Sequence, residues 1–367
     1  MRRLRAFVAD ELMPKAPADG ALLRYTGGAR VYDELVRQQT TTQLSAAQVH
    51  AIGLREMARI RAEMEAVMRQ AKFEGEFLAF VKFLNTDPRF FVKSPEELLA
   101  GYREITKRID AELPRYFAEL PRAPYGVRAM AAHRGPDSAE SYEGPAIDSS
   151  RPGWFNANAL GLRTRPTWGM ATLATHETVP GHHLQIARAI ELRDLPQFRR
   201  NVGYTAYNEG WALYAETLVG PIGIYDDPYS RFGHLQAQAW RAGRLVVDTG
   251  IHAMGWSRQQ AIDYMVERTG MDAGRMASEV DRYTSMPAQA LASMIGQVKI
   301  IELRDRAKAS LGDRFDIRRF HNAVLDNGAV PLGTLETLID VWIEQQARQG
   351  KTGLEPATLN KERSQLC

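Results

Sequence analysis

The sequence predicts a mostly α-helical protein with a small β element placed just before a cluster of histidines. Apolar residues recur at helical spacing over long stretches that begin at Ser or Asp and end at Gly. Pro and Gly recur between about residues 121 and 166, where the helical pattern is lost. Of the 367 residues, 44% are hydrophobic, which is enough to build a sizeable core.

Helices are expected wherever the apolar spacing is regular, and two of them begin with a recognisable cap. Ser45 is an N-cap, and Ser94 with Glu97 resembles a capping box. Pro114 is expected to kink or interrupt the second helix. The expected helices are Ser45 to about Lys72, Ser94 to about Leu120, Ser257 to Gly270, Asp272 through Tyr283, Asp316 to Leu325, and Thr334 to Gln349.

The segment 121–166 carries two strand-like runs, at 125–131 and 153–160, separated by Pro and Gly. These runs predict a β-hairpin or an edge sheet. No linker separates two domains, so residues 1–350 are predicted to form one mostly helical domain. The polar segment 351–367 is predicted to be a disordered tail.

Composition excludes several classes of function. The net charge of +3, from 47 basic and 44 acidic residues, argues against nucleic-acid and membrane partners. No apolar run follows Arg2, Arg3 and Arg5, so no signal peptide is recognised and a cytoplasmic protein is expected. The single cysteine, Cys367, allows no internal disulfide and no cysteine zinc cluster. The sequence does not determine the oligomeric state.

The segment His176 to His183 holds three of the eight histidines, with Glu177 directly after the first. Two imidazoles and a distant helical Glu are the ligand set of many catalytic zinc sites, in which the Glu after the first His is the general base. A straight helix would place the second ligand at position 180, which is Pro180. A bulge at Pro180 and Gly181 could bring His182 back beside His176. The alternative is a helix followed by a Pro-Gly turn and two exposed histidines.

A second acidic motif begins 25 residues after His183, with Asn208, Glu209 and Gly210. Glu209 is the candidate third metal ligand. Glu216 lies seven residues later on the same helical face, where it could orient a ligand histidine or simply be solvated. The remaining histidines are expected to be structural or exposed: His50, His133, His234, His252 and His321.

The two motifs resemble a large bacterial family known only as a domain of unknown function, distantly similar to gluzincin and thimet-oligopeptidase-like metallopeptidases. The matching strings are His-Glu-x-x-Pro-Gly-His at 176–182 and Glu-Gly-Trp-Ala-Leu-Tyr-x-Glu at 209–216. The resemblance implies a large helical metallopeptidase-like domain with one zinc ion per chain. It favours His182 over His183 as the second ligand. It also implies a further N-terminal helical segment in relatives, often behind a secretion signal, that precedes the region matched here.

A third block departs from the family pattern. Relatives have Pro-Gly-Gln-Ala followed by Tyr-Lys, whereas this chain has Ala288 in place of the Gly and Ser293-Met294 in place of Tyr-Lys. Tyr283 or His183 is a candidate for the missing donor near the reacting carbonyl. The candidates for substrate binding are Arg282, Gln289 and Asn156, and the strand at 154–158 is a candidate for pairing with an extended peptide.

These observations predict a zinc-dependent hydrolase of short peptides or small amides, in which Glu177 is the general base for a metal-activated water. Another divalent metal could occupy the same ligands. One alternative is a specialised hydrolase of a non-peptide amide or ester, which the changes at Ser293 and Met294 favour. The other is a catalytically inactive helical binding or scaffold protein.

Overall fold

The computed structural model describes residues 1–16, 20–148 and 150–352, the last four by their backbone alone. Most of these residues are helical. The α-helices are α1 (Arg2–Ala6), α2 (Gly28–Thr40), α3 (Ala46–Gln70), α4 (Phe77–Thr86), α5 (Pro95–Asp110), α6 (Met170–Glu177), α7 (His182–Glu191), α8 (Gln197–Asn201), α9 (Thr205–Leu218), α10 (Pro228–Met254), α11 (Arg258–Thr269), α12 (Ala273–Ser285), α13 (Ala292–Leu311), α14 (Ile317–Leu325) and α15 (Leu332–Thr352).

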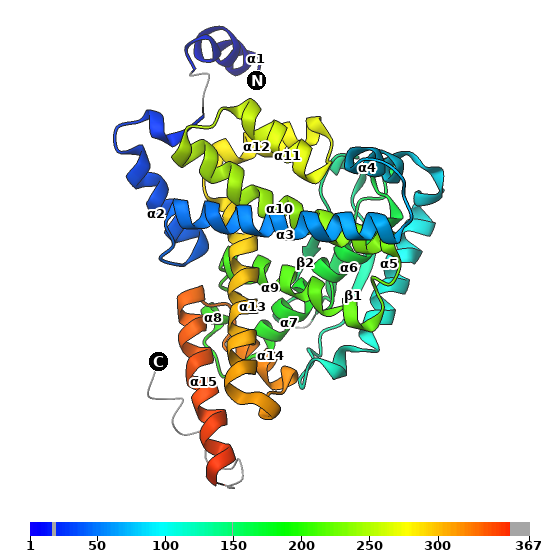
Figure 1. Cartoon of the computed structure of the whole chain (residues 1–367), viewed down its shortest axis with the longest axis vertical. Coiled ribbons are helices and arrows are strands. Elements are labelled where there is room, and N and C mark those ends of the chain that lie inside the picture. Colours follow the sequence, from blue (N-terminus) through cyan, green and yellow to red (C-terminus); the bar gives the residue numbers. More distant parts are fainter. Residues whose placement is uncertain (17–19, 149, 353–367) are drawn as a thin grey trace.

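The long helices α3 and α10 lie side by side across the molecule, and α11 and α12 pack against α10 (Figure 1). Gly53 lets α3 approach α10 closely, since a Cβ there would stand 2.7 Å from the Cβ of Leu245. Helix α13 packs on α9 and on α15. The main hydrophobic core lies between these helices, so α9 and α10 are both anchored in it.

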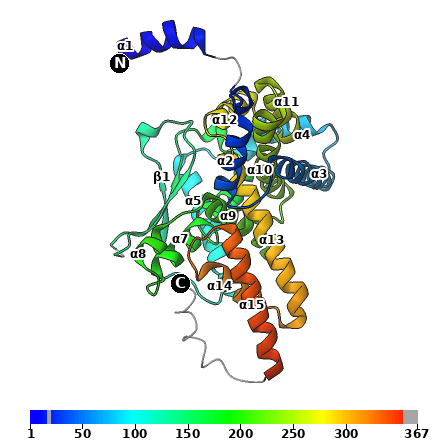
Figure 2. The same cartoon turned by 90° about the vertical axis from the view of Figure 1, so that its left-hand side faces the viewer.

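The strands form one small sheet, which lies on the opposite side of the molecule from α3 (Figure 2). The order is β1 (Tyr125–Ala129), β3 (Gly153–Ala157), β2 (Ser141–Glu143), with β1 parallel and β2 antiparallel to β3. One face packs on α5 and α6, where Phe155 is fully buried against Tyr102. The sheet therefore fixes the position of α6.

The expected mostly helical fold with a small sheet is confirmed, and most predicted caps are in place. Ser45 and Ser257 each form a complete capping box, and Asp272 caps α12. Ser94 caps α5, but the Glu97 carboxylate accepts from Lys93 N–H instead of closing the box.

Three sequence predictions need correction. Helix α5 ends at Asp110 rather than near Leu120, because Pro114 lies in a separate 3₁₀ turn at Leu113–Arg115. Of the two forms predicted for the β element, the small sheet is confirmed and the hairpin is wrong, since β1 and β3 are parallel strands of a three-stranded mixed sheet. The tail predicted from 351 begins inside α15, and its remainder, 353–367, lies outside the described residues. The assignment of 1–350 to one domain stays a prediction.

No helix in the described part of the chain has both the length and the apolar composition needed to span a membrane.

A buried carboxylate on α10 links three segments of the fold. Asp248 is fully buried, and its Oδ1 accepts from the Tyr32 hydroxyl at 2.6 Å and from Ala288 N–H at 3.0 Å. Its Oδ2 is also buried and has no partner among the described residues. Burial therefore raises the pKa of Asp248 from 3.8 to about 7, although both hydrogen bonds act to lower it.

This pKa predicts that the protein is more stable at mildly acidic than at alkaline pH. The folded state holds the Asp248 proton more tightly than the unfolded chain. The contribution of this proton to the free energy of unfolding is therefore complete below pH 3.8 and is lost as pH rises through about 7. The full shift corresponds to at most about 4 kcal/mol. The free energy of unfolding, measured with urea, should be lower at pH 8 than at pH 5. This decrease should be smaller in Asp248→Asn than in the wild type. An equal decrease in both proteins would contradict the assignment.

Candidate metal centre

The first candidate metal ligands are positioned by a break between two helices. Helix α6 ends at Glu177 and α7 begins at His182, so the expected bulge within one helix is instead a connection between separate helices. The Val179–Pro180 peptide bond within it is cis. Trp211 of α9, which is fully buried, donates its indole N–H to the carbonyl of Pro180 at 2.8 Å. Helix α9, which also carries Glu209, therefore holds this connection in place.

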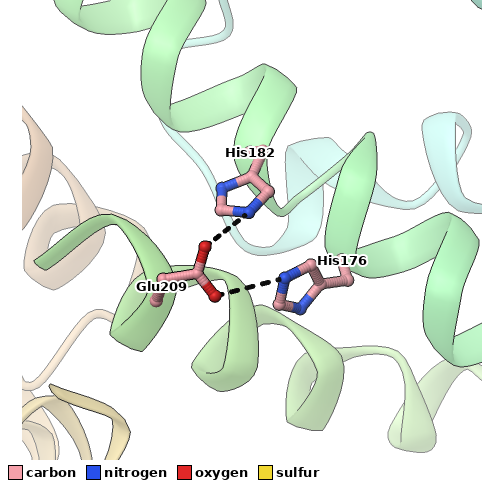
Figure 3. A group of neighbouring side chains, drawn as sticks. All are labelled: His176, His182 and Glu209. Atoms are coloured by element: carbon pink, nitrogen blue, oxygen red, sulfur yellow. Dashed lines mark ion pairs between the residues drawn. The ribbon is translucent and has the colours of Figure 1, made fainter. Parts of the chain in front are cut away.

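The break brings the rings of His176 and His182 together, with their centroids 4.7 Å apart and their planes nearly perpendicular at 87°. Glu209 of α9 faces both rings (Figure 3). His182 Nε2 lies 3.5 Å from Glu209 Oε1, and His176 Nε2 lies 3.8 Å from Glu209 Oε2. One ligand atom from each residue lies within 4.8 Å of the other two.

These distances fit a metal ion. The ligand atoms of a tetrahedral zinc site, with bonds near 2.1 Å, lie about 3.4 Å apart. Two imidazole nitrogens and one carboxylate oxygen are also a donor set that zinc accepts, leaving a further position open. The group of His176, His182 and Glu209 could therefore hold a metal ion, with small adjustments of the side chains.

Glu216 contacts Nδ1 of His176, the ring nitrogen that does not face Glu209. Its side chain is fully buried, and its Oε1 lies 2.8 Å from His176 Nδ1. A hydrogen bond at Nδ1 leaves the lone pair on Nε2, the nitrogen that faces Glu209. Burial acts to raise the pKa of Glu216, but the contacts with His176 and His234 lower it to about 2. The carboxylate is thus ionised and orients His176.

The pKa shifts of the ligands reflect the same geometry. Burial acts to raise the pKa of Glu209, but the hydrogen bond to His182 and the charges of His182, His176 and Arg241 lower it far below its ordinary value. Glu209 in turn raises the pKa of His182 against the effect of burial. Metal binding would replace the His182 proton, so the metal affinity should increase with pH.

Glu177 differs from the other two glutamates near the site. It is nearly buried at the end of α6, and its charge acts on His182. Among the described residues, no hydrogen bond or ion pair engages its carboxylate. Its oxygens are therefore available to a substrate or a water molecule.

His183, predicted as a possible donor, is engaged elsewhere. Its Nδ1 lies 2.8 Å from the Tyr142 hydroxyl and its Nε2 lies 3.1 Å from the carbonyl of Ala123. Burial lowers the pKa of His183 to about 4. The neutral ring thus donates to Ala123 and accepts from Tyr142, and it borders a hollow of about 770 Å³ that none of the three candidate ligands lines. The structure does not bring His183 into the metal group.

The residues predicted from the third block bind one another. The Tyr283 hydroxyl donates to Glu279 at 2.8 Å, and Arg282 donates to both Glu279 and Gln289, at 3.0 and 2.5 Å. Arg244 of α10 also contacts Glu279, at 3.1 Å. Tyr283, Arg282 and Gln289 form this network rather than contacting the candidate ligands.

The predicted peptide-pairing strand is in the wrong place for that role. The residues expected to pair, 154–158, belong mainly to β3, which is the middle strand and has both edges occupied by β1 and β2. Asn156 itself accepts from Arg128 at 2.7 Å. Pairing of a substrate peptide along β3 is therefore excluded.

Sequence reasoning missed the contribution of α10. His234, expected to be structural, lies with Nδ1 3.5 Å from Glu216 Oε2, and Arg241 acts electrostatically on Glu209 and Glu216. His234 and Arg241 are seven residues apart and so share a helix face, which is the one signal that could have linked them. Ser293, at the position of the missing Tyr, lies with its hydroxyl 3.4 Å from Glu209 Oε2.

The fold and the site define a mostly helical protein with a His-His-Glu group that could hold a metal ion. The family model "Bacterial protein of unknown function (DUF885)" matches residues 1–339, and the chain belongs to this family. No curated protein matches the chain.

Two solved structures are similar to this chain. A protein from Colwellia psychrerythraea, described as a "putative lipoprotein", has 37% sequence identity and a TM-score of 0.87; the match covers 92% of this chain and 59% of that one. A "putative lipoprotein of unknown function" from Shewanella oneidensis has 19% identity and a TM-score of 0.77, with 92% and 63% covered. The second likeness supports the fold alone. The chain spans about three fifths of the length of both.

The expectation of a cytoplasmic protein is wrong. The 37% identical relative is described as a "putative lipoprotein", a description that belongs to secreted or membrane-anchored proteins. The expectation rested on the residues after Met1, and these carry no information on location when the chain matches only part of its relatives.

Replacing Glu216 with Gln is expected to weaken the affinity of the His176, His182 and Glu209 group for an added divalent metal, with zinc as the probe, about 10- to 100-fold. The variant keeps the shape but removes the charge that orients His176. Competition of the protein with a chelating dye for zinc measures the effect. Glu65→Gln is the matched control, since Glu65 is a helical glutamate whose ion pair is with Arg61. Unchanged affinity in Glu216→Gln would show that the ring of His176 needs no support from the carboxylate charge.

Proposed function

We propose that this chain is a zinc-dependent hydrolase of amide bonds in short peptides, acting outside the cytoplasm. The observation that carries the proposal is the convergence of His176, His182 and Glu209 from three helices, beside Glu177, whose carboxylate is not engaged. The resemblance of both motifs to gluzincin metallopeptidases supports the same reaction class, and the lipoprotein relative supports the location.

The chain's own residues account for positioning and proton transfer. Zinc at this group would polarise the substrate carbonyl and lower the pKa of a water molecule to about 7. Glu216 keeps the His176 ring in one orientation. Glu177 accepts the proton of the attacking water at its carboxylate and delivers it to the leaving nitrogen. His176, Glu177 and Glu216 are buried, and His182 and Glu209 are partly buried, which limits competing water and strengthens the electrostatic interactions between these side chains.

A second candidate is a hydrolase of a specialised non-peptide amide or ester. The residues at the Tyr-Lys positions favour it, because the Ser293 hydroxyl contacts Glu209 and Met294 is buried, so neither a phenol nor an ammonium group is supplied there. Cleavage of small acyl amides or esters, with no cleavage across a peptide panel, would favour this candidate.

Metal content tests the proposal directly. Inductively coupled plasma mass spectrometry should find about one zinc per wild-type chain and almost none in His182→Ala, because two ligands bind zinc far more weakly than three. His133→Ala is the matched control, since His133 is exposed on another segment. Absence of metal from the wild type, even after incubation with zinc, would reject the proposal and favour a scaffold function.

A further inference from the structure

Three arginine side chains gather around one indole ring. The guanidinium carbons of Arg241, Arg244 and Arg275 lie 4.7, 4.1 and 4.7 Å from the ring centroid of Trp240. We call these three residues the Trp240 arginine cluster. Arg241 is partly buried, Arg244 has 12% of its side chain accessible, and Arg275 is exposed, so solvent reaches the cluster at Arg275. The indole face attracts each cation but leaves their mutual repulsion in place.

The carboxylates of the protein do not neutralise this cluster. Arg244 contacts Glu279 at 3.1 Å, but Glu279 is shared with Arg282 at 3.0 Å. In the described ranges, no carboxylate oxygen lies within the 4.0 Å ion-pair distance of Arg241 or Arg275.

Glu140 is the other carboxylate whose charge reaches Arg275, and Arg165 already holds it at 2.7 Å. Counting the cluster with its neighbours gives five arginines, the three of the cluster plus Arg165 and Arg282. Against them stand four carboxylates: Glu140 and Glu279, which act on Arg275, and Glu209 and Glu216, which act on Arg241. The local balance is five minus four, or one positive charge in excess before a metal ion is bound.

Arg241 of the cluster lies two turns along α10 from His234 and on the same helix face, and His234 Nδ1 lies 3.5 Å from Glu216 Oε2 beside the candidate metal group. The charge of Arg241 acts on Glu209, Glu216 and His182, and the charge of Arg275 acts on Arg241. The indole N–H of Trp240 is buried and has no acceptor among the described residues. An excess of positive charge beside the reacting group, with unused donors, is suited to an anionic part of the substrate.

We propose that the Trp240 arginine cluster binds a carboxylate of the substrate, so that the preferred peptides carry either a free C-terminus or an acidic side chain. The inference rests on the proposed function, because it assigns the substrate class of the same site. A planar guanidinium binds a carboxylate through two parallel N–H···O bonds. Arg241 donates from Nη1 to the carbonyl of Ala237 at 3.3 Å, but its other N–H groups and the guanidinium of Arg275 have no hydrogen-bond partner among the described residues. Arg282, the earlier candidate, instead serves to hold Glu279 and Gln289.

Calorimetric titration of the zinc-loaded Glu177→Gln protein tests the proposal without turnover. The probes are the tripeptide Ala-Ala-Phe as its free acid, the same peptide as its C-terminal amide, and Ala-Asp-Phe amide. The Ala-Ala-Phe acid should bind at least about 10-fold more tightly than its amide. Adding Arg241→Gln or Arg275→Gln should remove this preference. Tight, arginine-dependent binding of Ala-Asp-Phe amide alone would assign the carboxylate to a side chain.

Arg268→Gln is the matched control, since Arg268 also lies over an aromatic ring, that of Tyr264, but pairs with Glu267. Equal binding of all three probes, or no measurable binding, overturns the proposal. A preference that survives both arginine variants overturns the assignment to these residues. Turnover of the same peptides by the zinc-loaded wild type is measured separately. Absence of cleavage would contradict the proposed function. The binding preference would still show whether the arginine cluster binds a carboxylate.

Discussion

Replacing Glu177 with Gln is expected to lower kcat by about 10²- to 10⁴-fold and to leave the bound zinc in place. Glu177 follows the ligand His176 at the end of α6 and is not one of the three grouped ligands. Its carboxylate engages no partner in the described part of the chain, so Gln can replace it without breaking a hydrogen bond. Gln has the same shape but cannot accept a proton at neutral pH, so only proton transfer should be lost.

Two measurements on one preparation separate this role from a structural one. Turnover is followed on the best substrate of a peptide and amide panel, and zinc is counted by mass spectrometry. Glu267→Gln, a change at an exposed glutamate on α11, is the control and should alter neither quantity. Retained turnover with bound zinc would end the general-base assignment. Loss of zinc together with turnover would show that Glu177 holds the site together.

The parts of the fold that could be predicted are those that local chemistry determines. Ser45, Ser257 and Asp272 cap helices through bonds to residues three positions away, so their sequence patterns are sufficient. Helix α10 was not predicted because it is buried on several faces along Pro228–Met254, and a helix without a single apolar stripe has no clear periodic signal. The order of the sheet also depends on pairing between distant segments, which no local pattern specifies.

The same distinction applies to the candidate site. The His-Glu pair at 176–177 and Glu209 are recognisable because their residue types and spacing are local. The return of His182 to His176 is not local, since it depends on the path from Thr178 to Gly181 and on the contact of Trp211 with Pro180. Arg241 acts from a helix more than 50 residues after the first motif, where an arginine has no distinguishing sequence context.

The placement of His182 beside His176 depends most on Gly181. A Cβ at Gly181 would stand 2.1 Å from the carbonyl oxygen of His176 and 2.4 Å from that of Thr175. Both are backbone atoms at the end of α6, so no side-chain rotation can relieve the overlap. The connection between α6 and α7 would have to move, and His182, the next residue, would move with it.

Gly181→Ala is therefore expected to weaken zinc binding about 100-fold or more and to lower the free energy of unfolding by about 1–3 kcal/mol. Gly169→Ala is the matched control, because a Cβ there meets no atom within 4 Å and Gly169 precedes the same helix. Chelator competition measures the affinity and urea unfolding measures the stability. A Gly181→Ala protein that is less stable but binds zinc normally would mean that the path through Gly181 supports the fold without positioning His182. Weakened zinc binding in that variant, with normal binding in Gly169→Ala, would show that closeness of two backbone segments, rather than the histidines alone, makes the metal group.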